Sequence, residues 1–278
     1  MSSNLLDQLP HMTTRIEALM SGGQRSLGTA YFFDFEYPPR GSIPVLVTNK
    51  HVLQDAIKIT ITLSFGDSNG DAPLVGKFRE IEIDQHKEYV VEHPNSGVDL
   101  AVILIAPTLK KMDGQNLAPF YRSLSAEHIP NLTQIESLTA IEDILMVGYP
   151  TGIWDEANNL PVVRRGITAT PYARDFGNRA EFLIDCACFP GSSGSPVVIA
   201  TEGAHMAKDG RMRVGGRFFL LGTLFAGPMF NTEGNIVSMP VQTSAAQVSI
   251  SQIPMNLGYC VKSRMLRDLA PLVLNLRS

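Results

Sequence analysis

The most regular pattern in the chain is an unbroken alternation of apolar and polar residues over 57–65, Ile-Lys-Ile-Thr-Ile-Thr-Leu-Ser-Phe. A period of two puts the apolar side chains on one face of an extended chain, so this segment predicts a half-buried β-strand. Residues 66–71 are rich in glycine, aspartate and asparagine, which favour turns. A turn is therefore expected directly after this strand.

Apolar segments of strand length recur along the rest of the chain in two groups, which a polar, proline-containing linker over about 106–140 separates. In the first group they are 29–35, 45–48, 78–83, 89–91 and 99–105. In the second group they are 144–147, 162–170, 181–187, 196–200, 217–225 and 258–262. Short strands at this density predict an all-β chain, with a first barrel over about 24–125 and a second over about 141–262.

Residues 1–23 predict a helical extension. Thr14 and Glu17 have the spacing of a capping box. The apolar residues that would share one face of a helix over 12–20 are Ile16, Leu19 and Met20. We expect this helix to pack outside the barrels, with the remaining chain, 24–278, forming one domain.

The C-terminal segment 263–276 also predicts a helix, because its apolar residues recur at helical spacing. These residues are Met265, Leu266, Leu269, Leu272 and Val273. Pro271 favours a kink within this helix.

Composition limits the partners and cofactors. With 278 residues and 44% hydrophobic content, the chain can bury a large core without disulfide bonds or metals. The formal net charge is −4 and no run of Lys or Arg exceeds two residues, so neither nucleic acid nor a membrane is expected as a partner. Cys186 and Cys188 lack a second Cys or His pair at ligand spacing, so we expect buried thiols, no metal and no cofactor.

The start of the chain lacks the basic residues and long apolar stretch of a secretory signal, and no apolar run is long enough to span a bilayer. Three cysteines without framework spacing also differ from a secreted, disulfide-bonded protein. These features predict a cytoplasmic protein. They leave its oligomeric state open.

Three separate segments have the residue types that acyl transfer by a serine requires. Residues 189–198, Phe-Pro-Gly-Ser-Ser-Gly-Ser-Pro-Val-Val, can present a hydroxyl next to unpaired backbone N–H groups. Upstream, His51 lies in Leu-Val-Thr-Asn-Lys-His-Val and Asp99 in Val-Asp-Leu-Ala-Val. A serine hydroxyl needs a base that titrates near neutral pH, and a carboxylate must fix the tautomer of that base. The order His, Asp, Ser disfavours an α/β-hydrolase, whose motif is Gly-x-Ser-x-Gly and whose order is Ser, acid, His.

These segments resemble the motifs of the chymotrypsin and trypsin-like serine peptidases over roughly residues 24–265. The similarity is greatest to the bacterial, disulfide-poor branch, the high-temperature-requirement proteases and glutamyl endopeptidases. There His lies in T-x-x-H-V, Asp in D-x-A-V and Ser in P-G-x-S-G-x-P. The resemblance implies two six-stranded antiparallel β-barrels with the active site between them, and a C-terminal helix on the second barrel. It also implies a catalytic triad of His51 as general base, Asp99 as its orienting carboxylate and Ser193 as nucleophile, with the N–H groups of Gly191 and Ser193 as oxyanion donors.

Two positions depart from the animal trypsins. Ser192 stands where those enzymes have an Asp that receives the N-terminal ammonium made by zymogen cleavage, so activation by N-terminal insertion is not expected. Ala187 stands where trypsin carries the carboxylate that selects basic side chains. A small aliphatic residue is therefore expected at P1, the position before the cleaved bond. The residues expected to form this pocket are Ala187, Cys188, Phe189, Pro190, Leu224, Phe225 and Ala226.

Three functional hypotheses follow from these residues. The first is a serine endopeptidase, a hydrolase that forms an acyl-enzyme on Ser193 and acts on protein or peptide substrates. The second is a catalytically weak or silent protein of the same fold that binds a peptide by β-strand addition in its cleft. The third is a regulated protease that acts on one specific partner protein. Covalent labelling of Ser193 distinguishes the first from the second.

Overall fold

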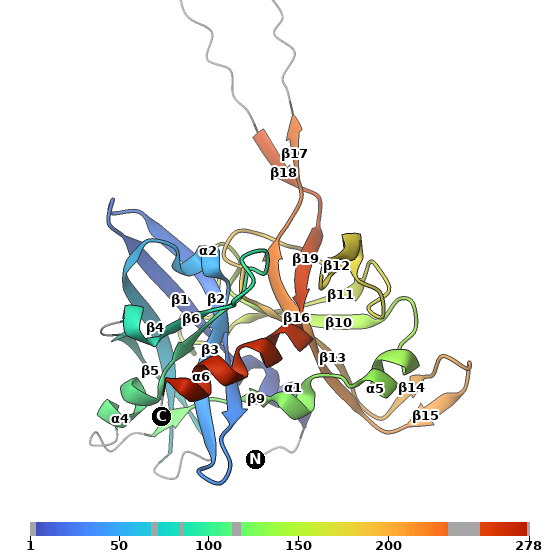
Figure 1. Cartoon of the computed structure of the whole chain (residues 1–278), viewed down its shortest axis with the longest axis horizontal. Helices are drawn as coiled ribbons and strands as arrows, with labels where there is room; N and C mark the ends of the chain where they lie inside the picture. Colours follow the sequence, from blue (N-terminus) through green and yellow to red (C-terminus); the bar gives the residue numbers. More distant parts are fainter. Residues whose placement is uncertain (1–3, 68–71, 84–85, 113–117, 233–250, 277–278) are drawn as a thin grey trace, which may run out of the picture.

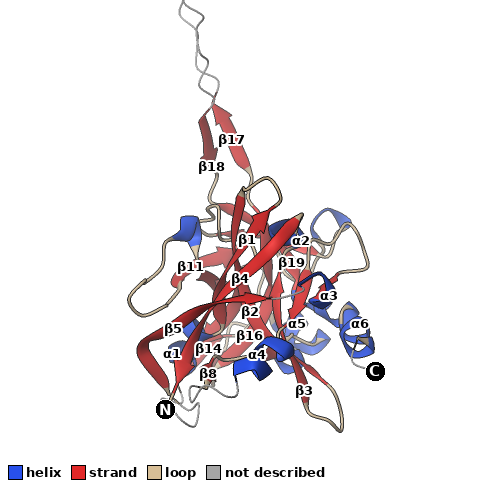
Figure 2. Cartoon of the chain, turned by 90° about the vertical axis from the view of Figure 1, so that its left-hand side faces the viewer, coloured by secondary structure: helices blue, strands red, loops and turns tan. Residues whose placement is uncertain are grey.

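The structure is a computed structural model, which describes residues 4–67, 72–83, 86–112, 118–232 and 251–276. Figure 1 shows two β-rich lobes side by side, with the β-hairpin formed by β17 and β18 projecting from the second lobe. Strands occupy the centre of the molecule and short helices lie at its periphery (Figure 2). Among the described residues, no helix is long and apolar enough to cross a membrane.

The first lobe is a nine-stranded sheet in which the main path runs β5-β4-β1-β2-β3-β7-β6, with β8 paired to β4 and β9 to β2. Its strands are β1 (Thr13–Met20), β2 (Arg25–Glu36), β3 (Ser42–Thr48), β4 (Ala56–Gly66), β5 (Pro73–Ile83), β6 (Val90–Glu92), β7 (Ala101–Leu104), β8 (Pro119–Phe120) and β9 (Leu124–Ser125). Within the described residues β5 and β6 are not paired with each other. Closure of this lobe into a six-stranded barrel therefore stays a prediction.

The predicted helix over 12–20 is wrong, because these residues form the strand β1 inside the first sheet. Ile16 pairs with Gly28 of β2 on one side and Ile61 of β4 on the other. The Thr14 hydroxyl donates to the backbone oxygen of Thr62 at 2.7 Å instead of capping a helix. Long-range pairing on both sides outweighs a helical spacing that only local contacts would stabilise. The helix that does occur near the N-terminus is α1 (Leu5–Gln8).

The second lobe is a closed barrel of six antiparallel strands, as predicted, in the order β10-β11-β12-β19-β16-β13. These strands are β10 (Asp143–Gly148), β11 (Val162–Thr168), β12 (Glu181–Asp185), β13 (Pro196–Thr201), β16 (Arg217–Ala226) and β19 (Leu257–Lys262). Two hairpins extend from it, β14 (Ala204–Met206) with β15 (Met212–Val214) and β17 (Met229–Thr232) with β18 (Ser251–Pro254). Each barrel strand is hydrogen-bonded on both sides, so the loops between strands are anchored at both ends.

The helices are all short. They are α1, α2 (Lys50–Leu53), α3 (His86–Tyr89), α4 (Ala106–Met112), α5 (Leu132–Ser137) and α6 (Ala270–Asn275), with 3₁₀ turns η1 (Leu9–His11), η2 (Ala126–His128), η3 (Pro150–Gly152), η4 (Phe176–Asn178) and η5 (Ser263–Asp268). The expected linker over 106–140 thus contains α4, α5 and the two strands β8 and β9. The expected C-terminal helix is divided into η5 and α6, with Pro271 in the first turn of α6. The domain limits at 23/24 and 278 stay predictions.

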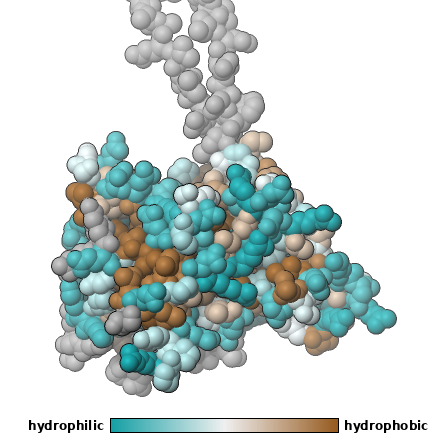
Figure 3. All heavy atoms as spheres, in the orientation of Figure 1, coloured by the Kyte–Doolittle hydropathy of each residue, from teal (hydrophilic) through white to brown (hydrophobic). Residues whose placement is uncertain are grey.

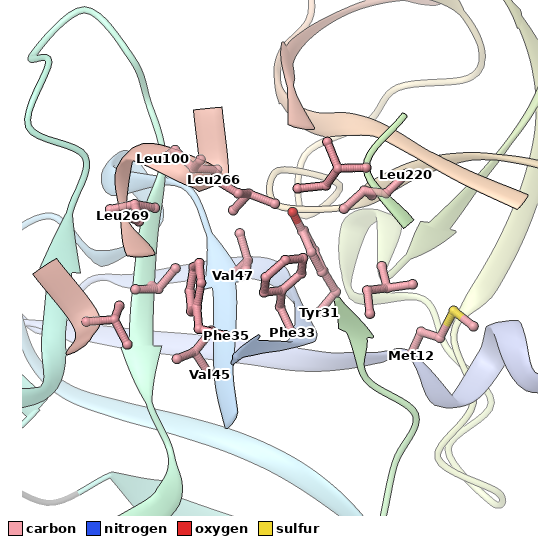
Figure 4. Packing of buried hydrophobic residues seen from close by; sticks show 14 of the residues in the cluster. Met12, Tyr31, Phe33, Phe35, Val45, Val47, Leu100, Leu220, Leu266 and Leu269 are labelled. Carbon is pink, nitrogen blue, oxygen red and sulfur yellow. The ribbon is translucent and has the colours of Figure 1, made fainter. Parts of the chain in front are cut away.

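One hydrophobic cluster joins the two lobes. It contains Tyr31 from β2, Leu220 from β16, and Leu266 and Leu269 from the C-terminal segment. Figure 4 shows Leu266 next to Tyr31 and Leu220, with Leu269 farther along the same cluster. In addition, the Tyr31 hydroxyl lies 2.9 Å from Oγ1 of Thr223, so a hydrogen bond also crosses the boundary. On the surface, Figure 3 shows apolar residues gathered over the side of the molecule where the first lobe and α6 lie.

Candidate active site

The side chains of His51 and Asp99 meet at the first lobe. His51 lies in α2, directly after β3, and Asp99 precedes β7, the strand that pairs with β3. Nδ1 of His51 lies 2.5 Å from Oδ2 of Asp99, and the backbone N–H of His51 donates to Oδ1 at 3.2 Å. Because a carboxylate only accepts hydrogen bonds, the proton of the neutral imidazole lies on Nδ1. Nε2 is then unprotonated, which is the tautomer a general base requires.

Neighbouring residues hold this pair in place. The buried Asn49 side chain donates from Nδ2 to the backbone oxygen of Asp99 at 2.7 Å. Lys50 donates from Nζ to the backbone oxygens of His93 and Asn95, at 2.8 and 3.1 Å. The segment that carries Asp99 is therefore attached to the two residues that directly precede His51, so these neighbours of the histidine bring the two motifs together.

Ser193 lies in the loop between β12 and β13 of the second lobe. Two glycines give this loop its shape, since Gly191 has φ of +84° and Gly194 has φ of +87°. A Cβ atom on Gly191 would lie 2.6 Å from the backbone oxygen of Tyr149, and one on Gly194 would lie 1.9 Å from that of Thr29. Both the backbone conformation and the close packing therefore require glycine at these positions.

The backbone amides of this loop differ in their hydrogen bonding. Those of Ser192, Gly194 and Ser195 donate to carbonyl oxygens of the protein, at 3.0, 2.8 and 3.0 Å. The amides of Gly191 and Ser193 donate to no other residue that the structure describes. Unpaired backbone donors are uncommon unless a ligand uses them. Two free N–H groups beside the Ser193 hydroxyl are the arrangement that an oxyanion requires.

Thr29 of β2 connects the first lobe to this loop. Its backbone N–H donates to the Ser193 oxygen at 2.8 Å, and its hydroxyl donates to the Gly191 oxygen at 3.1 Å. The Thr48 hydroxyl in turn donates to the Thr29 oxygen at 2.8 Å. Thr48 precedes the Asn49–His51 segment, so a short series of hydrogen bonds sets the position of His51 relative to the serine loop.

The Ser193 hydroxyl itself makes no hydrogen bond to His51 or to another described residue. In unliganded active sites such bonds are often long and form only when substrate is bound. The structure thus brings His51 and Asp99 into direct contact and places Ser193 beside two free amides.

A cavity of about 140 Å³ lies next to Ser193. It is lined by Cys188, Phe189, Pro190, Ser193, Leu224, Ala226, Gly227 and Pro228. Ala187 and Phe225, which were also expected in the pocket, do not line it. The Ala187 backbone oxygen accepts a hydrogen bond from Arg164, and Phe225 turns toward Tyr259, with a ring separation of 6.2 Å.

The cavity has no charged side chain in its lining. Burial raises the pKa of Cys188 to about 12, so its thiol is neutral at physiological pH. No group of three or more His, Cys, Asp or Glu side chains suited to a metal ion occurs in the described part of the chain. The cavity is therefore apolar and neutral.

A family model for the trypsin-like peptidase domain matches residues 28–206, which include all three motif segments. The chain belongs to this family. A search of curated proteins gave no match.

Among solved structures, the trypsin-like peptidase described here is similar to three proteases. An HtrA-type protease, AlgW with a tripeptide, is 17% identical with a TM-score of 0.50, over 97% of this chain and 62% of the other. A serine endoprotease from Yersinia pestis is 16% identical with a TM-score of 0.49, over 97% and 65%. The active form of the Rv3671c protease from M. tuberculosis is 14% identical with a TM-score of 0.46, over 95% and 82%. At these identities the first similarity shows the fold, and this chain spans less than two thirds of the first two proteins.

The motif residues of this trypsin-like peptidase could be located from the sequence, whereas several of their neighbours could not. Thr29 has no local signal, because it is an ordinary threonine in a predicted strand, and Thr48 belongs to the T-x-x-H-V motif but had no expected role. Pro228, which lies beyond the end of β16, was not expected to line the pocket. Their roles depend on which segments the fold brings together.

Proposed function

We propose that the protein is a serine endopeptidase that uses His51, Asp99 and Ser193 as its catalytic triad. Membership of the trypsin-like peptidase family and the fold support serine endopeptidase activity. The observation that carries the assignment of residues is the pair of free amides at Gly191 and Ser193, because the other amides of this loop, at Ser192, Gly194 and Ser195, are all paired within the protein.

In this mechanism Nε2 of His51 accepts the proton of the Ser193 hydroxyl as its oxygen attacks the peptide carbonyl. The carbonyl oxygen becomes an oxyanion that accepts hydrogen bonds from the N–H groups of Gly191 and Ser193. Asp99 stabilises the imidazolium through Nδ1. His51 then donates the proton to the leaving amine, which leaves an acyl-enzyme on Ser193, and water hydrolyses this ester by the same steps in reverse.

We also propose small aliphatic residues at P1. A cationic side chain in the neutral cavity would lose hydration without gaining a charged partner, whereas an aliphatic one gains about 0.8 kcal/mol per buried CH₂. Restriction to one partner protein and cytoplasmic residence stay expectations from the sequence.

The test is covalent labelling with a fluorophosphonate. The wild type should react at one serine, and Ser193→Ala should not react. Ser137→Ala, which removes an exposed hydroxyl in α5, is the matched control and should label as the wild type does. Labelling that persists in Ser193→Ala contradicts the assignment.

The second candidate function is a peptide-binding module with minimal turnover. The missing hydrogen bond between the Ser193 hydroxyl and His51 favours it. A binding module predicts that the fluorophosphonate does not label the wild type, which is the opposite of the result expected for a peptidase. It also predicts measurable binding of extended peptides.

A further inference from the structure

The residue before the proposed nucleophile has a buried environment that the mechanism leaves unexplained. Ser192 is 0% exposed and its amide is bonded to the Phe189 oxygen. Its hydroxyl oxygen lies 3.0 Å from Nη1 of Arg164. Ser192 has no carboxylate with which to receive an ammonium group, so another group must hold this part of the loop.

Arg164 lies in β11 and binds both ends of the loop. The same Nη1 that contacts Ser192 also donates to the backbone oxygen of Ala187 at 2.5 Å. A guanidinium Nη carries two N–H groups, so one nitrogen can donate to both acceptors. The Arg164 side chain therefore links Ala187 to Ser192. The segment between these two residues includes Gly191, whose amide is free.

The charge on Arg164 has no counter-ion in the described part of the chain. No carboxylate pairs with it there, and its Nε and Nη2 are buried without a hydrogen-bond partner. The thiols of Cys186 and Cys188 interact with it electrostatically. Burial lowers the pKa of Arg164, yet a guanidinium stays charged at neutral pH. Burying a cation with two unpaired N–H donors costs stability, so stability alone does not explain an arginine at this position.

We propose that Arg164 is a positioning residue that holds the 187–193 loop in the conformation that presents the amides of Gly191 and Ser193 to the oxyanion. The proposal rests on the proposed peptidase function. The guanidinium comes from β11 of the second barrel, so this contact does not depend on a new N-terminus.

The central variant is Arg164→Met, which keeps an unbranched side chain but removes the charge and the donors. Its matched control is Arg165→Met, the next residue of β11, whose side chain is 73% exposed. Arg164→Met should lower kcat/KM by about 10²-fold, as loss of an oxyanion donor does. Arg165→Met should stay within about twofold of the wild type, as is usual for surface substitutions.

A peptide aldehyde ending in valine separates positioning from general damage. Its hemiacetal oxyanion uses the same amides as the transition state, so its affinity should fall in parallel with kcat/KM. The matching peptide amide lacks an electrophile and should bind Arg164→Met with little change. Arg164→Lys, which keeps the charge but not the fork geometry, should be intermediate. Wild-type aldehyde affinity in folded Arg164→Met overturns the proposal.

Ser192→Ala covers the case in which Arg164→Met does not fold. It removes one acceptor of the bridge and should lower kcat by about tenfold, the value of one charge-assisted hydrogen bond, with KM unchanged. An unchanged kcat in Ser192→Ala also overturns the proposal.

Hydrogen exchange of the loop amides distinguishes a failure of the Arg164 proposal from a failure of the proposed peptidase function. If the wild type does not react with the fluorophosphonate, the peptidase assignment fails. Arg164→Met should still accelerate exchange at Ser192 and Gly194, whereas Arg165→Met should not. Equal protection in both variants shows that Arg164 does not hold the loop, whatever the activity.

Discussion

The two lobes contribute to the candidate site in different ways. The first lobe supplies side chains, and His51 and Asp99 remain 42% and 24% exposed. The second lobe supplies the Ser193 hydroxyl and backbone N–H groups, from a loop in which Ser192 and Ser195 are fully buried. A proton-transfer group must reach the substrate, whereas oxyanion donors act best when they need no reorganisation. The difference in burial therefore matches a division between proton transfer by side chains of the first lobe and oxyanion stabilisation by the backbone of the second.

The sheets explain this difference. In the closed second barrel every strand has two neighbours, so the loop between β12 and β13 is fixed at both ends. In the first sheet β6 is an end strand that pairs only with β7, and the segment that carries Asp99 joins these two strands. Side chains such as Asn49 and Lys50 hold that segment instead. The first lobe thus depends on particular side-chain contacts where the second depends on strand pairing.

The largest effect should come from removing one reacting group from each lobe. His51→Ala and Ser193→Ala should each lower peptide hydrolysis by about 10⁴ to 10⁶-fold, since both residues act at the chemical step. Steady-state rates on a peptide substrate, with circular dichroism to verify folding, test this. Comparable turnover in either folded variant would break the division of roles between the lobes.

Next in size is the effect of Asp99→Asn, which tests the side-chain chemistry of the first lobe alone. The amide cannot hold the Nδ1 proton as a carboxylate does, so the rate should fall by about 10⁴-fold. Asp55→Asn, a change in the exposed turn after α2, is the control and should keep wild-type kcat/KM. If the two results are reversed, Asp55 is the orienting acid.

Gly191→Ala tests the backbone chemistry of the second lobe. The new methyl group would lie 2.6 Å from the Tyr149 oxygen, so the loop must shift and the Gly191 amide moves with it. We expect kcat to fall by about 10² to 10³-fold. Gly210→Ala also introduces a side chain at positive φ, +75°, but meets no atom within 4 Å. Equal kcat values in the two variants would show that the position of the loop does not matter.

The apolar pocket belongs entirely to the second lobe and predicts a smaller discrimination. Cleavage after valine or alanine should exceed cleavage after arginine by about 10 to 10²-fold in kcat/KM, from the cost of burying an unpaired charge. Profiling with a peptide library that varies only P1 measures this ratio. Dominant cleavage after Arg or Lys would show that a carboxylate such as Asp185 reaches the pocket.

The smallest effect should come from the link between the lobes. Thr29→Val keeps the shape of the side chain but removes the hydroxyl that donates to the Gly191 oxygen at 3.1 Å. The same hydroxyl accepts from the backbone N–H of Tyr149 at 3.1 Å and from the Ser195 hydroxyl at 3.3 Å, so its removal breaks three hydrogen bonds. We expect a loss of about tenfold in kcat. Thr29→Ser keeps the hydroxyl and should retain most of the activity. An identical loss in Thr29→Ser would assign the effect to packing of the methyl group.

The parts of the protein that were predicted correctly from the sequence have local causes. Alternation over 57–65 marks β4, because side-chain direction in a strand depends only on its neighbours along the chain. The glycines of 191–195 likewise mark a loop, because Gly191 and Gly194 have the positive φ that favours glycine. The chemistry of His51, Asp99 and Ser193 could be proposed for the same reason, since each motif is complete within a few residues.

Other features depended on contacts between distant segments. Residues 13–20 satisfy both a helical and a strand pattern, and pairing with β2 and β4 decides for the strand. The hydrogen bonds from Thr29 to Gly191 and from Arg164 to Ser192 join residues that are 162 and 28 positions apart. The sequence therefore determined which residues can do chemistry, whereas the tertiary structure decided how they are held, because hydrogen bonds across the lobe boundary and between barrel segments leave no periodic or local pattern in the chain.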